Sequence, residues 1–291
     1  MDDPTRLARL LLESAANAAQ ACNARAIIVA ADALPDSADL PSLPDNTVLV
    51  TRDPLDEPAA ERLRERAAAV IQVPNVELDR LGQVKLAAII ALSNRILDLG
   101  DDVVFLTGPF RSMVDSLVVM NIGAEYELFD TTEQRSIDEH IKRAVFHRVL
   151  TLALQLGQHG REGRRVGALL VVGSHRRVLE QAEQLILNPF KGYDEKERNI
   201  LDEQMTETVK EFSVIDGAFI IRGNGVIETA GAHLKAGLTE NLPSGLGARH
   251  AAAAGITAST KSIAISVSES DGTVRVWRAG KMVASFEPSH R

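Results

Sequence analysis

The chain has 291 residues, 45% of them hydrophobic and 25% charged, a balance that is typical of a folded globular protein and excludes general disorder. Its formal net charge of −8 argues against nucleic acid or an anionic membrane as a partner, so an anionic ligand would have to be captured by local geometry. Cys22 is the only cysteine and no run of about 18 apolar residues occurs, which excludes an intrachain disulfide and favours a cytoplasmic protein.

Residues 1–130 alternate patterns typical of helices with patterns typical of strands. We expect an amphipathic helix from Leu7, a charged helix over 59–68 and a long helix with one buried face over 78–99, with a loop over 34–44. Short apolar runs predict strands at 26–30, 48–50, 70–73, 103–106 and 118–120. Strands separated by helices predict a mostly parallel sheet covered on both faces, and therefore an N-terminal α/β sandwich domain.

A domain boundary is expected between residues 130 and 131. Thr131 and Gln134 have the spacing of a capping box, which predicts that a helix begins there. Its apolar side would continue to Leu156, and the helix would end among the glycines at 157, 160 and 163. We expect this helix to open the second domain, residues 131–291.

The second half predicts a mixed sheet with helices. A continuous apolar strand is expected at 166–172, then a helix over 178–186 that stops before Pro189, then a charged helix over 194–212. Asn224-Gly225 predicts a tight hairpin in which both turn residues have positive φ. Alternating and apolar runs predict a closing meander with strands at 263–268, 274–277 and 282–286.

A glycine-rich stretch, ending in Gly247, Ala248, Arg249 and His250, leads into a run of alanines that favours a helix. The first turn of a helix presents unpaired amides and a partial positive charge, which suits phosphate, and Arg249 adds a permanent cation. The alternative interpretation is a helix cap with an exposed arginine.

Acidic residues adjoin two predicted strands. Asp216 precedes Gly217 and Ala218 where one strand begins, and Ser268-Glu269 lies where the alternating strand ends. Their carboxylates could bind a hard cation, and a glycine lets a ligand approach the backbone closely. The alternatives are a turn aspartate and a solvated strand end.

Taken together, these elements resemble the diadenylate cyclase domain family. The resemblance extends from about residue 166 to 286, and the order and spacing of its motifs agree: residues 167–172, Asp216-Gly217-Ala218, residues 230–234, Arg249-His250 and residues 267–269. Residues 188–193, with Glu211-Phe212, are similar to the archaeal-type branch in particular. In that branch an N-terminal domain similar to the C-terminal, allosteric domain of pyruvate kinase precedes the cyclase.

The resemblance implies a diadenylate cyclase that condenses two ATP molecules into cyclic di-AMP with release of two pyrophosphates, using Mn²⁺ or Mg²⁺. It implies a homo-oligomer, at least a dimer, because two sites must face each other to form two symmetric bonds. Asp216 would bind the metal beside the attacking 3′-hydroxyl, and Arg249 and His250 would hold the triphosphate. Further positions are implied at the nucleotide, its phosphates or the metal: Gly217, Ala218, Leu234, Gly247, Ala248, Ser268 and Glu269.

The sequence departs from the wider family beside Arg249. Ala248 and Ala251 stand where that family usually has a threonine and a second arginine, so a hydroxyl and a cation are missing. Phosphate binding is then expected to rely on backbone amides, Arg249 and the metal. This departure leaves open a degenerate cyclase that senses adenine nucleotides without chemistry. A separate alternative, which rests only on the general features of the chain, is a two-domain α/β protein whose oligomeric role is structural.

Overall fold

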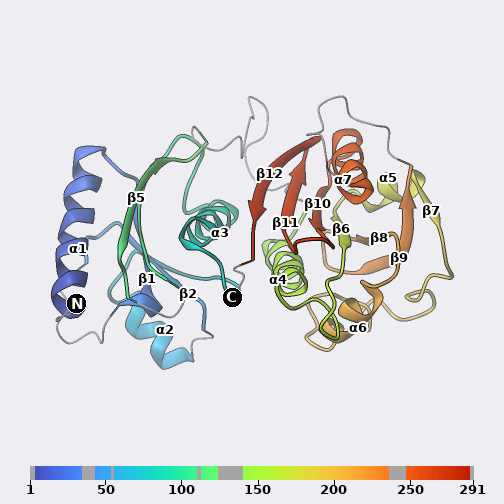
Figure 1. The fold of residues 1–291 in the computed structure, drawn as a ribbon, viewed down its shortest axis with the longest axis horizontal. Helices are drawn as coiled ribbons and strands as arrows, with labels where there is room; N and C mark the ends of the chain where they lie inside the picture. Colours follow the sequence, from blue (N-terminus) through green and yellow to red (C-terminus); the bar gives the residue numbers. More distant parts are fainter. Residues whose placement is uncertain are drawn as a thin grey trace. The chain divides into compact units, whose positions relative to one another are not determined.

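The computed structural model describes residues 4–34, 43–53, 56–109, 113–123, 140–235 and 247–288. The chain divides into two compact units, Met1–Gln134 and Arg135–Arg291 (Figure 1). The boundary expected between 130 and 131 and the capping box expected at Thr131 lie outside the described residues. Among the helices in the described ranges, none combines the length and the hydropathy of a membrane span.

The first unit is an α/β domain built on a mostly parallel sheet. Its strand order is β3-β2-β1-β4-β5, in which β4 and β5 are antiparallel and the other neighbours are parallel. The elements are α1 (Pro4–Ala21), β1 (Ala26–Ala30), the 3-10 helix η1 (Ala31–Ala33), β2 (Thr47–Thr51), α2 (Glu57–Arg64), β3 (Ala69–Gln72), α3 (Arg80–Ser93), β4 (Asp102–Thr107) and β5 (Ser116–Asn121).

Helices cover both faces of this sheet, as predicted (Figure 1). Ile27 and Val29 of β1 pack with α1 on one face, and Ile28 lies on the other face with residues of α3. Successive strand residues point to opposite faces, so a continuous apolar run is what a sheet buried on both sides requires. The helix expected over 78–99 is shorter in the structure, because α3 ends at Ser93 and Arg95 has a positive φ of 58°. Most of its residues are buried, where the sequence predicted one buried face.

The second unit is a mixed sheet with strand order β12-β11-β10-β6-β8-β9-β7. In it β6 and β8 are parallel, and every other neighbouring pair is antiparallel. The elements are α4 (Arg143–His159), β6 (Ala168–Val172), α5 (His175–Glu180), β7 (Ala182–Gln184), α6 (Met205–Phe212), β8 (Ala218–Ile221), β9 (Ile227–Leu234), α7 (Ala248–Ser259), β10 (Ile263–Val267), β11 (Val274–Arg278) and β12 (Lys281–Phe286).

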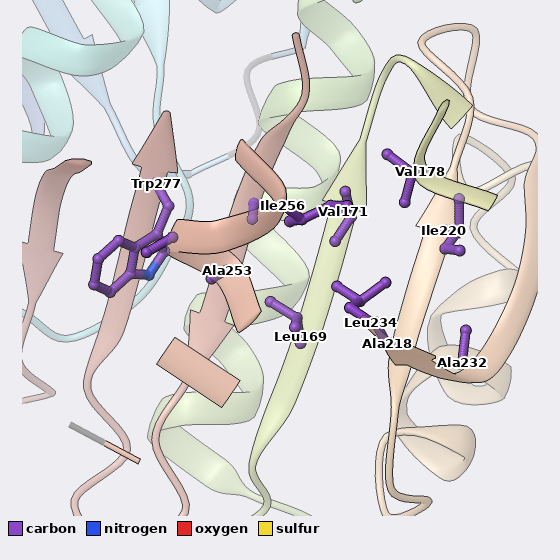
Figure 2. Close-up of a cluster of buried hydrophobic side chains, with 12 residues drawn as sticks. Leu169, Val171, Val178, Ala218, Ile220, Ala232, Leu234, Ala253, Ile256 and Trp277 are labelled. Atoms are coloured by element: carbon purple, nitrogen blue, oxygen red, sulfur yellow. The ribbon is translucent and has the colours of Figure 1, made fainter. Parts of the chain in front are cut away.

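A core of buried side chains joins α7 to the sheet (Figure 2). Ala253 and Ile256 of α7 pack with alternate strand residues such as Leu169, Val171 and Trp277. The opposite face of the sheet is covered by α4, which contacts β6, β10 and β11. The small residues of α7 let the helix lie close to the sheet, so its first turn is held at a fixed place on the sheet edge.

Two helices predicted in this unit are wrong over most of their length. α5 ends at Glu180, and residues 182–184 instead form β7, which pairs with the edge of β9. The apolar side chains in this segment are compatible with either a helix or a strand. The strand forms because its backbone can hydrogen-bond to the edge of β9. The charged helix expected from 194 begins only at Met205, in α6. The predicted hairpin exists between β8 and β9, but of its two turn residues only Gly225 has a positive φ.

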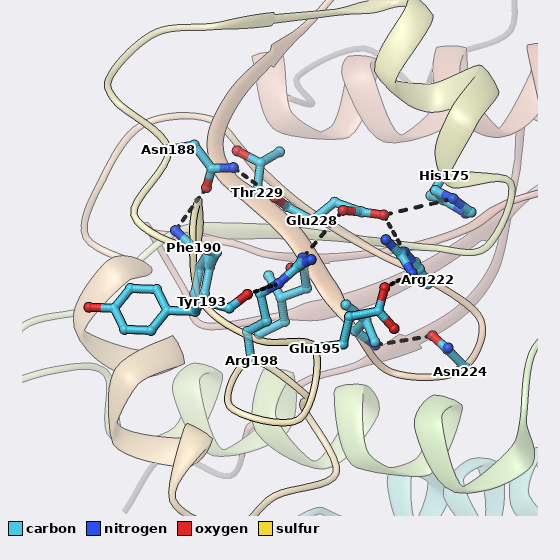
Figure 3. Close-up of polar contacts among 12 residues, drawn as sticks. His175, Asn188, Phe190, Tyr193, Glu195, Arg198, Arg222, Asn224, Glu228 and Thr229 are labelled. Carbon is cyan, nitrogen blue, oxygen red and sulfur yellow. Dashed lines mark hydrogen bonds and ion pairs between the residues drawn. The ribbon is translucent and has the colours of Figure 1, made fainter.

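Ion pairs centred on Glu228 of β9 hold the segment between β7 and α6 against the sheet (Figure 3). Arg222 donates to the Glu228 carboxylate, and Arg198 of the segment donates to it at 3.3 Å. Arg198 also donates to the carbonyl of Ile227 at 2.5 Å. Burial would raise the pKa of Glu228, but the hydrogen bonds and charges of the two arginines hold it below its ordinary value.

We predict that Glu228→Gln lowers the free energy of unfolding at pH 7 by roughly 1–3 kcal/mol, because two guanidinium groups lose their anion. Glu195→Gln is the matched control. Glu195 also pairs with Arg222 but is 57% exposed, so its loss should cost less than about 1 kcal/mol. Denaturant unfolding of both variants measures the difference.

The pKa of Glu228 is lowered by folding, so its stabilising effect is present above the ordinary glutamate pKa and is lost as the pH falls through the lowered value. The gap between wild type and Glu228→Gln should therefore narrow in acid. A gap that stays constant down to about pH 3 would contradict this account.

Candidate functional site

The strand order brings separate parts of the sequence to one edge of the second sheet. β6 and β8 are parallel and begin at the same edge, and β10, antiparallel to β6, ends there. Asp216 and Gly217 precede β8, and Ser268 and Glu269 follow β10. The first turn of α7 lies at this edge with Arg249. The topology therefore places one acid on either side of the start of β6.

Arg249 connects the two acids. Its Nη2 atom lies 3.0 Å from Oδ1 of Asp216, and its Nη1 atom lies 3.0 Å from Oε2 of Glu269. The planar fork of a guanidinium can serve two carboxylates at once. The Asp216 side chain is 87% exposed and that of Glu269 66%, so both acids are open to ligands and the pairs add little to stability.

A cavity of about 680 Å³ opens beside these side chains, a size that suits a nucleotide-sized ligand. Its lining includes both apolar leucine and alanine side chains and charged side chains. The lining residues are Leu169, Leu185, Asp216, Gly217, Ala218, Ala232, His233, Leu234, Gly247, Ala248, Arg249, His250, Ala252, Val267, Ser268, Glu269, Ser270, Asp271 and Arg275. Every residue that the sequence singled out for the site is among them, while their individual roles stay predictions.

His250 is the least exposed of the charged or titratable residues expected at the site, at 7%. Its ring lies 6.0 Å from that of Trp277, and its Nε2 atom is 3.1 Å from Nη1 of Arg275. Burial lowers the pKa of His250, and the neighbouring charge of Arg275 lowers it further. A neutral imidazole that accepts from an arginine is therefore the form that this environment favours.

The turn after β10 is held by its own side chains. The amide of Thr273 donates to Oδ1 of Asp271 at 2.9 Å, and the hydroxyls of Ser268 and Ser270 lie 3.0 Å apart. Burial would raise the pKa of Asp271, but hydrogen bonds from Ser268 and Thr273 lower it to about 2. Asp271 is therefore ionised at neutral pH and adds a third negative charge to the cavity wall.

Two glycines make close approaches at this edge. Gly217 has φ = 109°, and a Cβ on it would lie 2.6 Å from the backbone carbon of Gly231 in β9. Gly167, before β6, faces the Arg249 guanidinium, which a Cβ would displace. The packing of Gly217 against the backbone of β9 thus explains why a glycine is present there. The sequence had suggested a different explanation, the close approach of a ligand.

The donor set fits a divalent metal ion. Asp216 and Glu269 offer hard carboxylate oxygens that already converge on one cation, the Arg249 guanidinium. Within the described ranges no group of three or more His, Cys, Asp or Glu side chains gathers around a point. A metal ion held here would accordingly need further oxygen ligands, which the phosphates of a bound nucleotide or water can supply.

Sequence reasoning missed Arg275 and Asp271 as cavity residues. Both lie in or beside the closing meander, and nothing in their spacing marks them. Arg275 is opposite Ser266 in the β10–β11 register and two residues before Trp277, so it points to the α7 face. Only the pairing register, together with the position of α7, reveals that it reaches the cavity.

Comparisons with known proteins agree with this division into two units. Residues 155–282 match a family model described as DisA bacterial checkpoint controller nucleotide-binding, and residues 7–129 match a model described as probable sensor domain DacZ_P. The chain is 39% identical over 206 residues to a diadenylate cyclase from Methanocaldococcus jannaschii, covering 68% of this chain and 64% of that protein. It is 34% identical over 201 residues to a diadenylate cyclase from Haloferax volcanii, covering 68% and 72%.

Solved structures give weaker likenesses. A hypothetical membrane spanning protein from Bacillus cereus has a TM-score of 0.38 and 18% identity, covering 53% of this chain and 66% of that one. A double mutant of DacA from Staphylococcus aureus has a TM-score of 0.33 and 22% identity, covering 50% and 87%.

We predict that Gly217→Ala lowers the free energy of unfolding by about 2 kcal/mol or more, because the new methyl group meets backbone atoms at a positive φ. Gly167→Ala is the matched control. Its methyl group meets chiefly the far end of the Arg249 side chain, which can shift by side-chain rotation, so it should cost less than about 1 kcal/mol. Denaturant unfolding of the two variants compares them, and equal losses would contradict this account of Gly217.

Proposed function

We infer that this chain, which belongs to the diadenylate cyclase family, condenses two molecules of ATP into cyclic di-AMP and releases two pyrophosphates. The observation that carries the proposal is the convergence of Asp216, Arg249 and Glu269 on one cavity of nucleotide size. Family membership rests on the Haloferax volcanii relative, whose length the chain covers to 72%. The chain spans 64% of the length of the Methanocaldococcus jannaschii relative, so the activity of that protein supports the inference without establishing it.

In the proposed reaction the 3′-oxygen of each ATP attacks the α-phosphorus of the other. A new P–O bond forms, the bond to the β-phosphate oxygen breaks, and pyrophosphate leaves with its electron pair. The exposed carboxylate of Asp216, two residues before β8, would orient the 3′-hydroxyl and take up its proton. Arg249 would turn from the two acids to the polyphosphate and offset the charge of the leaving group.

A Mn²⁺ or Mg²⁺ ion would be held by Asp216 and Glu269. Bound there, it would offset the triphosphate charge and favour ionisation of the 3′-hydroxyl. The remaining work belongs to the protein. The apolar lining residues Leu169 and Ala218 offer a surface for the adenine ring, and Leu234, the last residue of β9, lines the same cavity.

The product has two equivalent new bonds, while one cavity of this size holds one ATP. We therefore propose that two cyclase units face each other across a two-fold axis, and that the working enzyme is a homo-oligomer, at least a dimer. The exposure of both acids supports this arrangement, because the face that carries them is open to a second unit.

The first unit would sense an effector or drive further assembly. Its match to a model of a probable sensor domain supports this role. A buried polar group also lies at the carboxyl ends of its parallel strands, where α/β sheets commonly bind ligands. There Arg52 pairs with Asp32 at 2.5 Å and donates to Gln83. The likeness of this unit to a pyruvate kinase domain stays a prediction.

We predict that Asp216→Asn lowers cyclic di-AMP formation by at least about a hundredfold, because the amide can neither take up a proton nor bind a metal ion as well. Purified protein is incubated with ATP and Mn²⁺ or Mg²⁺, and the dinucleotide is detected by mass spectrometry. Asp194→Asn, which changes an exposed acid outside the cavity, is the matched control and should keep full activity.

The thermal midpoint of Asp216→Asn should stay at the wild-type value, since the side chain is exposed. Normal turnover by this variant would show that the site is assigned wrongly. If the wild type binds ATP but forms no product under any metal or pH, the chain is a nucleotide sensor, the alternative that Ala248 and Ala251 suggest. Failure to bind ATP at all would favour a structural role.

A chain lacking residues 1–134 should keep the sheet and core of the second unit, because the two units are separately compact. We predict that its cyclase activity no longer responds to the effectors of the full chain, or that its assembly is smaller. Light scattering and the mass-spectrometric assay measure both properties. A truncated chain with the same assembly state and the same response would contradict a regulatory role for the first unit.

A further inference from the structure

Arg275 comes to the cavity from an element that the nucleotide motifs do not include. It lies in β11 on the face covered by α7, between the cavity and the core residue Trp277. Its Cα pairs with that of Ser266 in β10, so its position is fixed by the sheet. Its side chain is half-buried and lines the same cavity as Arg249.

The guanidinium of Arg275 is oriented by His250. Nη1 of Arg275 donates to Nε2 of His250 at 3.1 Å, so Nε2 is the acceptor and the ring proton is on Nδ1. His250 is itself fixed, because it is buried in α7 and its ring packs near Trp277. A buried neutral acceptor holds a cation in place without neutralising it.

The charges of the cavity wall favour a second cation for the ligand. Asp216, Glu269 and Asp271 contribute three carboxylates, and the described lining residues with a permanent positive charge are Arg249 and Arg275. Arg249 serves two of the acids at 3.0 Å each. A triphosphate carries up to about four negative charges, which a divalent ion and one shared arginine together offset only in part.

We infer that Arg275 binds the polyphosphate of the substrate and that His250 is a positioning residue, which acts through Arg275. This rests on the proposed function, since it assigns the second cation of that same site. The family resemblance implies that His250 contacts the phosphates. The inference instead assigns that contact to Arg275 of β11. It also supplies a cation to a site that lacks one beside Arg249, where Ala251 stands.

The rival role for Arg275 is structural. Its charge helps to lower the pKa of Asp271, and it could serve only to hold the turn after β10. The two roles differ in what they predict for ligands. A structural arginine affects every ligand of the cavity alike, whereas a phosphate-binding arginine affects only ligands that carry phosphates.

The test uses the full-length protein with Mg²⁺ and two probes, 3′-deoxy-ATP, which lacks the attacking hydroxyl, and 3′-deoxyadenosine, which lacks the phosphates. Calorimetry measures both dissociation constants. We expect Arg275→Met to weaken binding of 3′-deoxy-ATP by about tenfold or more and to change that of 3′-deoxyadenosine by less than about twofold. Arg275→Lys, which keeps the charge, should recover part of the loss.

Arg278→Met is the matched control, because it removes a cation from the same strand outside the cavity, and it should bind both probes like the wild type. Two variants test His250. His250→Leu should weaken 3′-deoxy-ATP binding, whereas His250→Gln should weaken it less, because glutamine keeps a hydrogen-bond acceptor for Arg275. Equal weakening of both probes by Arg275→Met, or no weakening, would overturn the inference.

These outcomes are separable from those of the proposed function. If wild-type protein forms cyclic di-AMP while Arg275→Met binds 3′-deoxy-ATP normally, the cyclase assignment stands and the role of Arg275 is wrong. If no dinucleotide forms but Arg275→Met loses affinity for 3′-deoxy-ATP alone, the phosphate contact stands and the reaction is wrong.

Discussion

The site depends on one guanidinium placed between two carboxylates that lie beside the ends of different strands. Asp216 and Glu269 are far apart in sequence, and with both ionised they would repel each other if nothing positive lay between them. Arg249 supplies that charge without a ligand, so the two acids are already aimed at one point. Asp216 and Glu269 are also the residues that would hold a divalent ion, whose positive charge would then serve both acids and leave Arg249 available to the substrate.

This arrangement is possible because small residues line the edge of the sheet. Gly167 leaves room for the Arg249 guanidinium, and Gly217 lets the start of β8 approach β9. The alanines of α7 let its first turn lie close to the strand ends. Close backbone packing at these small residues thus leaves room for the charged side chains that line the cavity.

The sequence predicted well whatever depends on neighbouring residues. The strands of the first unit and the motifs around Asp216 and Arg249 are contiguous, so their patterns are readable without knowing the fold. The sequence-based prediction failed where the structure of a segment depends on contacts with residues far away in the sequence. β7 exists because β9 has an open edge, and the segment after it is held by Glu228 instead of forming a helix. Arg275 was missed for the same reason, since its place in the cavity depends on sheet register and on the position of α7.

Trp277 is the only tryptophan of the chain, and its indole is buried beside the imidazole of His250 with Nε1 donating to Ser266 at 2.9 Å. Residues 1–134 contain no indole. Emission excited at the red edge of protein absorbance therefore originates in the second unit alone, from a fluorophore next to the residue that orients Arg275. The full-length chain carries its own optical probe of this pocket, with no label and no contribution from the other unit.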